Sequence, residues 1–249
     1  MEEVKIRHQV SIAGKVTNAQ TNKAIAEAQV KIVNAPETFV SSLITTARLI
    51  VLTNEPQAVR QARMMLDNST ASQSQKLEAV GKIFDFLMAR QALANPRLDL
   101  TLTAVDGLFY WLNLPQGEYS LIASVPSLKR RYGVSKKVTI TVADLDKSHS
   151  IADLTLPSTN LIGKITHSTE TKAEPIILAQ VQIKGSQEST FSNSQGEYIL
   201  SELESSKRSR TILVRARGYQ AKEETVTLSQ PGEQQTLNFE LISQSGLNP

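Results

Sequence analysis

His167 and Glu170 have the spacing of two metal ligands. The segment His167-Ser168-Thr169-Glu170 carries the His-x-x-Glu pattern of a zinc carboxypeptidase. A catalytic zinc takes three protein ligands, and this pattern requires another histidine far downstream. No histidine follows His167 in the sequence. We therefore interpret the segment as a turn at the end of a strand.

The other residues that could do chemistry also lack the spacing of a site. His8 and His149 have no Asp or Glu at helical metal spacing, and Asp144, Asp146 and Asp153 lack the spacing and the glycine of a calcium loop. The sequence has no cysteine, no Gly-x-Ser-x-Gly nucleophile elbow and no Gly-x4-Gly-Lys-Ser/Thr phosphate loop. We therefore predict no catalytic residue, no metal and no cofactor, and we do not expect an enzyme.

The composition is that of an ordinary globular protein. Of the 249 residues, 40% are hydrophobic and 20% are charged, and the formal net charge of +3 is too small to indicate a nucleic-acid or membrane partner. Met1 to Lys5 do not begin a secretory signal, and the apolar run Leu43 to Leu52 is interrupted and too short to cross a bilayer. We expect a cytoplasmic protein without a membrane span.

The stretch from Thr103 to Val125, TAVDGLFYWLNLPQGEYSLIASV, predicts two strands joined by a turn. Asp106-Gly107 suits a tight turn, and the bulky residues after it suit a pleated strand. Pro115 and Gly117 favour the next turn, and Tyr119 begins an alternation of apolar and polar residues. One face of this second strand is therefore expected to be buried.

The same pattern occurs twice in the chain, in the same order. Ala28 lies 79 residues before Gly107, whereas Ala179 lies 17 residues before Gly196, so the first copy carries 62 additional residues. The matching segments are Ala13-Gly14-Lys15-Val16-Thr17 with Ile162-Gly163-Lys164-Ile165-Thr166, Ala28-Gln29-Val30-Lys31-Ile32 with Ala179-Gln180-Val181-Gln182-Ile183, and Asp106-Gly107-Leu108-Phe109 with Gln195-Gly196-Glu197-Tyr198.

The additional residues of the first copy have the pattern of helices. Asn34 before Pro36 suggests a first helix start, and Thr53 or Asn54 before Pro56 suggests a second. A third helix is expected from about Gln75 to Ala94. Three helices, or a helical hairpin with a short helix, would form a small bundle on the sandwich.

Outside this insertion, roughly seven short strands per copy predict an antiparallel β-sandwich. The fold class is therefore mainly β, with two tandem antiparallel sandwiches, the first of which has a helical insertion. We expect a first domain over residues 1–157 with the insertion at about 36–97, a stiff linker at Pro157-Ser158-Thr159, and a second domain over residues 158–249.

These motifs resemble the carboxypeptidase regulatory-like domain, a transthyretin-like (prealbumin-like) sandwich. The resemblance rests on AGKVTNAQTNKAIAEAQVKI, DGLFYWLNLPQGEYSLIAS and KVTITV in the first copy, and on IGKITHSTETKAEPIILAQVQI, SNSQGEYILSEL, RTILVRARGYQ and ETVTL in the second. The second copy departs from the family at the turn Leu203 to Lys207, and the insertion is not part of the usual domain. The resemblance implies Ig-like or transthyretin-like sandwiches and a non-catalytic role beside a working domain.

Two groups of residues are candidates for binding a protein partner. The first group is Phe39, Phe84, Phe86 and Met88, which would anchor a partner if the apolar stripes of the helices are not core. The second is the basic hairpin Lys129-Arg130-Arg131, with another basic cluster at Lys207, Arg208 and Arg210. Such charges either contact phosphates or an acidic surface, or are solvated loop residues.

The leading hypothesis is a structural or adaptor subunit that docks into a larger intracellular assembly through its helices and hairpin ends. The family resemblance suggests a phage-tail-like contractile particle, or contractile injection system, as one such assembly. The alternative is a ligand-binding module, most plausibly for a carbohydrate, which would need exposed aromatic rings. Tyr110 and Trp111 are adjacent, so alternation along a strand turns one ring inward and the other outward.

Overall fold

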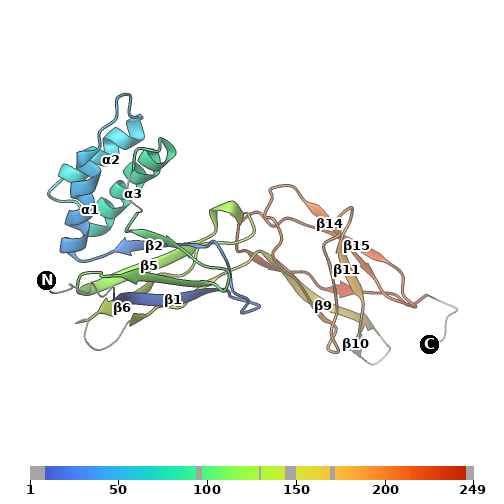
Figure 1. Ribbon diagram of the computed structural model, residues 1–249. Helices are drawn as coiled ribbons and strands as arrows, with labels where there is room; N and C mark the ends of the chain where they lie inside the picture. Colours follow the sequence, from blue (N-terminus) through green and yellow to red (C-terminus); the bar gives the residue numbers. More distant parts are fainter. Residues whose placement is uncertain (1–8, 94–96, 129, 144–149, 169–171, 245–249) are drawn as a thin grey trace. The chain divides into compact units, whose positions relative to one another are not determined.

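The computed structural model describes residues 9–93, 97–128, 130–143, 150–168 and 172–244. The chain forms two compact units, Met1–Pro126 with Ser135–Thr155, and Ser127–Val134 with Leu156–Pro249. Both units are mainly β, and the three α-helices among the described residues belong to the first (Figure 1). The expected division at Pro157 assigns residues 127–134 to the first domain, whereas the compact units group them with the second.

The first unit is a sandwich of two sheets. One sheet has the order β4-β1-β7, with β8 also paired to β1, and the other has the order β3-β2-β5-β6. β1 runs antiparallel to β4 and parallel to β7, and all neighbouring strands of the other sheet are antiparallel. The strands are β1 (Val10–Asn18), β2 (Gln29–Asn34), β3 (Leu100–Leu102), β4 (Leu108–Leu112), β5 (Gly117–Ser124), β6 (Val138–Val142), β7 (Ser150–Ile151) and β8 (Leu154–Leu156).

Alternate side chains of these strands fill the space between the two sheets. In β5, Tyr119, Leu121 and Ala123 are buried and Glu118 is exposed. In β4, Phe109 and Trp111 are buried, and their rings pack edge-on with centroids 5.8 Å apart. The alternation predicted for this hairpin is therefore confirmed except at Ser120, a polar residue of the pattern that is buried and whose hydroxyl lies 2.8 Å from that of Thr139.

Three helices lie between β2 and β3, namely α1 (Glu37–Leu49), α2 (Gln57–Asp67) and α3 (Gln73–Ala89). They are folded onto the sheet that contains β2 and β5, as Figure 1 shows. Phe39 of α1 packs edge-on against the ring of Tyr119, with centroids 5.7 Å apart. At the start of α3, the Ser74 hydroxyl lies 3.2 Å from the Asn34 side-chain oxygen at the end of β2.

The starts of the helices differ from the expected ones. The residues that precede α1 and α2 are Pro36 and Pro56, whose side chains offer no hydrogen-bond acceptor, so the helix starts predicted at Asn34 and at Thr53 or Asn54 are wrong by two or three residues. The third helix begins two residues earlier than expected. Its N-cap is Ser72, whose hydroxyl accepts from the Gln75 amide while the Gln75 side chain accepts from the Ser72 amide.

The second unit is also a sandwich of two sheets. In one sheet β9 pairs with β10, β13, β16 and β17, and the other has the order β12-β11-β14-β15. β16 and β17 run parallel to β9, and the other ladders are antiparallel. The strands are β9 (Asn160–Ser168), β10 (Ala173–Pro175), β11 (Gln180–Ile183), β12 (Ser189–Phe191), β13 (Glu197–Leu200), β14 (Arg210–Arg215), β15 (Lys222–Val226), β16 (Gln234–Thr236) and β17 (Phe239–Glu240).

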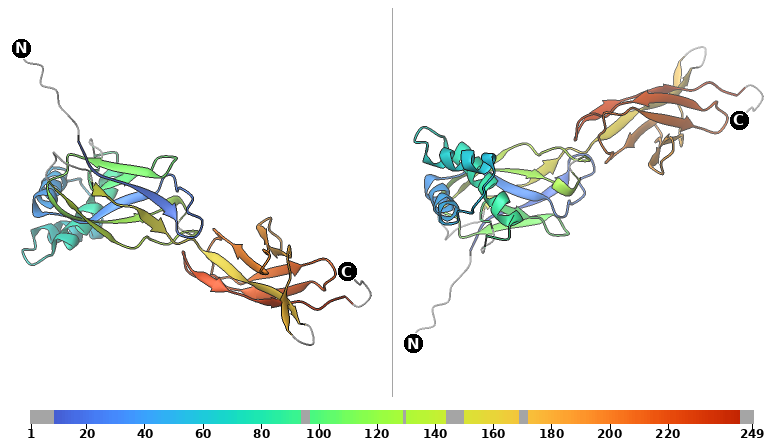
Figure 2. Two further views of the ribbon diagram at one scale, coloured as in Figure 1. Left: turned by 90° about the horizontal axis from the view of Figure 1, so that it is seen from below. Right: turned by 90° about the horizontal axis from the view of Figure 1, so that it is seen from above.

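Its core is apolar and includes two large rings. Tyr198 and Phe239 are buried, with ring centroids 6.3 Å apart. The Tyr198 hydroxyl donates to the carbonyl of Leu237 at 2.6 Å, and burial raises the pKa of this phenol. Figure 2 shows the strands of this unit from two further sides.

Ser158 and Thr159 do not form the stiff linker that was predicted. Both are fully buried within the second unit. The amide of Thr159 donates to the carbonyl of Arg131 at 2.7 Å, and its own carbonyl accepts from Leu203 at 2.9 Å. The segment is therefore an integral part of the hydrogen bonding of that sandwich.

Candidate interaction surfaces

The aromatic residues predicted as partner anchors have different environments. Phe39 and Phe84 are buried, so these two rings belong to the chain's own core and are not surface anchors. Phe86 is partly exposed, and the guanidinium of Arg90 lies 5.7 Å from its ring centroid. Met88 is 50% exposed at the end of α3. The amphipathic pattern could not distinguish the four, because it does not say which stripe the sheet covers.

Arg97 connects α3 to the strand that follows it. Its guanidinium forms ion pairs with Asp99 at 2.7 Å and with Asp85 of α3, and it lies 5.8 Å from the ring centroid of Phe84. Asp99 is fully buried. Burial alone would lower the pKa of Arg97, but the two carboxylates more than compensate and raise it. The insertion is therefore attached to the sandwich by a paired buried charge as well as by apolar contacts.

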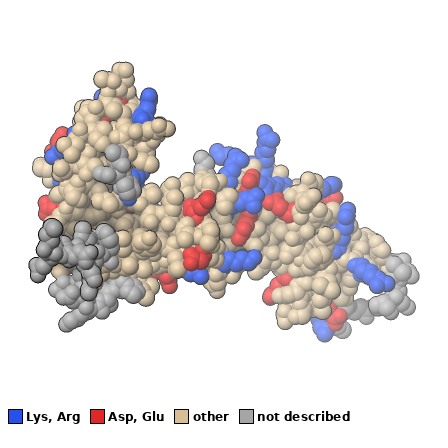
Figure 3. Space-filling view, in the orientation of Figure 1, with Lys and Arg blue, Asp and Glu red and all other residues tan. Residues whose placement is uncertain are grey.

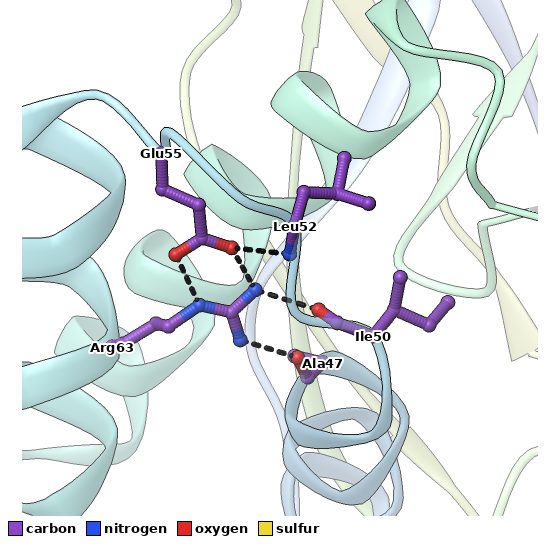
Figure 4. A network of polar contacts seen from close by, with 5 residues as sticks. All are labelled: Ala47, Ile50, Leu52, Glu55 and Arg63. Carbon is purple, nitrogen blue, oxygen red and sulfur yellow. Dashed lines mark hydrogen bonds and ion pairs between the residues drawn. The ribbon is translucent and has the colours of Figure 1, made fainter.

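Arg63 of α2 holds the connection between α1 and α2 (Figure 4). Its guanidinium donates to the Glu55 carboxylate at 2.5 and 2.7 Å, to the carbonyl of Ala47 at 2.7 Å and to that of Ile50 at 2.6 Å. The Leu52 amide donates to Glu55 at 3.3 Å. The hydrogen bond from Arg63 lowers the pKa of Glu55, although burial opposes this. Arg63 therefore satisfies carbonyls at the end of α1 that lack a helical partner.

Three large apolar side chains are exposed at or next to the residues of this hydrogen-bonded connection. Leu49 is 79% exposed, Val51 is 67% exposed and Met64 is 72% exposed. Leu49 and Val51 flank Ile50, whose carbonyl Arg63 binds, and Met64 follows Arg63 in α2. We call Leu49, Val51 and Met64 the helical platform. The helical platform is hard to recognise in the sequence, because single exposed apolar residues are common on protein surfaces.

A groove of about 340 Å³ lies between α2 and α3. Small side chains line it, including Ala58, Ala62 and Ala79, together with Met65. The exposed ion pair between Glu78 and Lys82, with 2.8 Å between the charged atoms, also belongs to its lining. The insertion therefore has both exposed apolar residues and a concave surface.

The two basic clusters predicted separately lie together in the second unit. The amide of Ser205 donates to the carbonyl of Arg130 at 2.7 Å, which places the 130–131 segment beside the 205–208 segment. Arg131 forms a 3.6 Å ion pair with Glu204. Lys129 lies outside the described residues. We call the cations Arg130, Arg131, Lys207, Arg208 and Arg210 the basic end, and Figure 3 shows Lys and Arg atoms gathered over these segments.

Tyr110 is the outward ring of the adjacent aromatic pair. It is 60% exposed, whereas Trp111 is buried and its indole nitrogen donates to the carbonyl of Leu98 at 2.9 Å. Leu108 and Leu112, on the same face of β4, are also exposed. The predicted alternation is confirmed, and this face presents one aromatic ring between two leucines.

His167 lies on β9 and contacts two side chains. Its Nδ1 lies 3.2 Å from the Tyr219 hydroxyl, and its Nε2 lies 3.9 Å from the Glu174 carboxylate. Glu170, like His8, His149, Asp144 and Asp146, lies outside the described residues. Among the residues described, no three His, Cys, Asp or Glu side chains are grouped so that they could hold a metal ion.

A shallow hollow of about 400 Å³ lies on the outer face of the sheet around β9 and β13. Ile162 and Ile199 contribute apolar surface to it, and Asn193 and Gln234 contribute polar groups. Asn238 also lines it, but its side-chain oxygen already accepts from the Lys164 amide at 2.9 Å. The hollow thus has a mixed lining without a cluster of convergent charges.

Residues 161–248 match the model of the CarboxypepD_reg-like domain. This match covers the second sandwich and agrees with the resemblance of the motifs IGKITHSTETKAEPIILAQVQI and SNSQGEYILSEL. The matched residues do not include the first sandwich. No curated protein matches the chain in sequence.

Several solved structures are similar to the chain at low identity. The shaft pilin SpaA from Lactobacillus rhamnosus GG is 9% identical, with a TM-score of 0.38 over 98% of this chain and 100% of that chain. The Bacillus anthracis TIE protein is 12% identical, with a TM-score of 0.31 over 94% of this chain and 34% of that chain. A type II cohesin–X-dockerin complex from Acetivibrio cellulolyticus is 18% identical, with a TM-score of 0.29, over 34% of this chain.

The last match covers 58% of the cohesin–dockerin chain, so little more than half of that protein's length is matched. At TM-scores this low, the likeness implies no shared function. Among the helices of the described ranges, none is long and apolar enough to cross a membrane.

Proposed function

We propose that the chain is a non-catalytic structural or adaptor subunit that docks on a protein partner through the helical platform. The observation that carries this proposal is the exposure of Leu49, Val51 and Met64 around a connection that Arg63 holds rigid. Burying a large aliphatic side chain contributes about 1.5–3 kcal/mol. Because hydrogen bonds already hold the backbone of the connection, little backbone conformational entropy would be lost on binding.

The packing of the insertion supports the same proposal. The helices bury Phe39 and Phe84 against their own unit and pair the buried Asp99 through Arg97. They are therefore a folded attachment whose outward residues are free to serve another purpose. A sandwich with an attached rigid helical layer suits a scaffold that presents a surface to a neighbour.

Two finer statements belong to this proposal. The first unit would be a second carboxypeptidase regulatory-like, transthyretin-like domain, interrupted by the helices. The larger assembly would be intracellular, and a phage-tail-like contractile particle is the class that the resemblance suggests. The support for the first statement is the motif order shared by the two halves of the sequence.

The test is affinity recovery of the tagged full chain from its native host, followed by mass spectrometry. The platform variant carries Leu49→Ser, Val51→Ser and Met64→Gln. The control carries three substitutions of exposed apolar residues elsewhere, Val105→Ser, Ile177→Ser and Ile242→Ser. A stoichiometric set of proteins that the platform variant loses and the control retains would support the proposal and identify the assembly.

Equal recovery by both variants would contradict the proposal. We prefer point variants to deletion of residues 36–97, because deletion removes the buried contact of Phe39 with Tyr119. Deletion also requires a new connection beside Asp99, which pairs with Arg97. A lost partner could then reflect a damaged sandwich.

The alternative function, carbohydrate binding, is supported by the exposed Tyr110 between Leu108 and Leu112. A sugar ring can stack on an aromatic ring, and an outward ring on a rigid strand would serve this purpose. If recovery from the host yields no partner with either variant, a glycan array probed with the full chain and with Tyr110→Ala is the next measurement. Binding that Tyr110→Ala abolishes would favour this alternative.

A further inference from the structure

We infer that the basic end of the second unit binds an acidic segment of a partner protein through its carboxylates. The inference begins with the arrangement of the backbone. The Arg130 carbonyl accepts from Ser205, and the Arg131 carbonyl accepts from Thr159, both at 2.7 Å. Downstream, the Ser206 amide donates to the carbonyl of Leu228 at 2.6 Å. The backbone that carries these cations is therefore fixed by main-chain hydrogen bonds to the sandwich.

The charge of this surface is unbalanced. The described residues of 127–134 and 202–210 hold the five cations of the basic end and two carboxylates, Glu202 and Glu204, an excess of three positive charges. Within the described parts of the chain, Arg131 is the one member of the basic end with an ion pair, formed with Glu204. These two segments therefore carry a local excess of positive charge.

The kinds of cation favour an oxyanion, a carboxylate or a phosphate, as the bound group. Four of the five are arginines, Arg130, Arg131, Arg208 and Arg210. The planar guanidinium binds either group with two parallel hydrogen bonds and is less strongly hydrated than the lysine ammonium, so arginine is favoured at interfaces. A loop that is merely solvated would be served equally well by lysine, because it does not use the paired hydrogen bonds of a guanidinium group.

The neighbouring apolar residues indicate a protein rather than a nucleic acid. Leu128 and Val134, at the two ends of the 127–134 segment, are 42% and 56% exposed and could contact apolar side chains of an acidic peptide. Single-stranded nucleic acid is bound by aromatic rings on which bases stack. The ring available here, Tyr132, is buried. An acidic segment with interspersed apolar residues therefore fits this surface better.

The test measures fluorescence anisotropy of a labelled synthetic peptide made of repeated Glu-Glu-Leu units, with the full chain at low and moderate salt. Probes for comparison are the same peptide with Gln in place of Glu, and labelled oligo-dT. We expect the acidic peptide to bind, the Gln peptide not to bind, and the affinity to fall as salt rises. The basic-end variant carries Arg130→Gln, Lys207→Gln and Arg208→Gln, and it leaves the Arg131–Glu204 pair intact.

This variant should weaken the binding of the acidic peptide about tenfold, because each exposed ion pair changes a dissociation constant by a few-fold at most. The matched control removes the same charge from exposed cations elsewhere, through Lys23→Gln, Arg215→Gln and Arg217→Gln. Equal weakening by both variants would mean that net charge alone is responsible and would overturn the inference. So would the absence of acidic-peptide binding, or binding of oligo-dT that is tighter and depends on the basic end.

The inference does not depend on the helical platform. The platform variant should bind the acidic peptide as the wild type does, since its substitutions lie in the first unit. Failure of the proposed function and failure of this inference are therefore distinguishable. If the platform variant lost the peptide, the basic end would not be the site.

Discussion

Thr103 and Ser192 make the same pair of hydrogen bonds in their two sandwiches. The Thr103 hydroxyl accepts from the Ala28 amide at 2.9 Å and donates to the carbonyl of Ile25 at 2.6 Å. The Ser192 hydroxyl accepts from the Ala179 amide at 2.9 Å and donates to the carbonyl of Ile176 at 2.7 Å. Both hydroxyls are buried, so each satisfies two backbone groups that water cannot reach.

Replacing either hydroxyl should destabilise its own unit. Thr103→Val and Ser192→Ala each leave a buried amide and a buried carbonyl without a partner, at a cost of about 1–3 kcal/mol. Urea denaturation followed by circular dichroism measures the loss. The control is Ser194→Ala at an exposed position, which should change stability by less than about 0.5 kcal/mol. If Ser192→Ala lowered the free energy of unfolding as little as this control does, the hydrogen bonds of the buried Ser192 hydroxyl would not stabilise its unit.

Gly14 and Gly163 should not tolerate a side chain. A methyl group at Gly14 would overlap the carbonyl of Ala152 and the ring of Phe109, and one at Gly163 would overlap the carbonyl of Leu237 and the ring of Tyr198. Because backbone atoms cannot yield cheaply, Gly14→Ala and Gly163→Ala should each cost about 3 kcal/mol or more. Thermal unfolding of each variant measures the effect.

The matched control for these variants is Gly185→Ala. No atom among the described residues lies within 4 Å of the position that a methyl group at Gly185 would occupy, but its φ is +82°, so an alanine there should cost about 1–2 kcal/mol through backbone strain alone. A Gly14→Ala protein as stable as the Gly185→Ala protein would show that β1 can move away from Ala152 without penalty.

Removing Arg97 should be strongly destabilising because it leaves Asp99 buried and unpaired. Arg97→Met is expected to cost about 3–5 kcal/mol, and the double variant Arg97→Met/Asp99→Leu should recover much of this loss. The exposed pair between Arg48 and Asp67 is the control, and Arg48→Met should cost less than about 1 kcal/mol. If chemical denaturation gave Arg97→Met and Arg48→Met the same free energy of unfolding, the pairing of Arg97 with the buried Asp99 would not stabilise the protein as argued.

The Glu55–Arg63 contact should make stability depend on pH in the acid range. The hydrogen bond from Arg63 lowers the pKa of Glu55 in the folded state below its ordinary value of 4.5. The stabilisation is therefore fully present above pH 4.5 and is lost as pH falls through the lower, folded-state pKa. The stability difference between the wild type and Glu55→Gln should shrink as pH falls from neutral to about 3.

Urea denaturation of both proteins across this pH range measures the difference. The control is Glu118→Gln, at an exposed position of β5. Its difference from the wild type should stay small at every pH. If the difference in free energy of unfolding between the wild type and Glu55→Gln does not change with pH, the ionised carboxylate of Glu55 contributes nothing to stability.

Most of the regular structure could be predicted from local pattern. The alternation in β4 and β5 identified Phe109, Trp111 and Tyr119 as inward residues, because the side-chain period of a strand is two. The helices were located by their apolar spacing, and a Ser-x-x-Gln capping box at Ser72 and Gln75 would have given the start of α3 more closely. β10 and β12 have only three residues each, which is too short for a periodic signal.

The candidate surfaces depended much more on the tertiary structure. A helical stripe predicts that one face is covered but not by what, so the sequence offers Phe39 and Phe84 as surface anchors although both rings are buried. The basic end joins segments near Arg130 and Arg208, which pattern alone could not bring together. The hydrogen bond from the Ser205 amide to the Arg130 carbonyl, a long-range contact, shows that the two segments are adjacent.

The sequence by itself determined the two sandwiches, the inserted helices and the inward residues of the hairpin, because these depend on periodicity and on turn chemistry within short stretches of chain. Only the tertiary structure decided which apolar and charged side chains remain exposed. The physical reason is that the exposure of a side chain depends on what packs against it, and residues that pack together can lie far apart in the sequence.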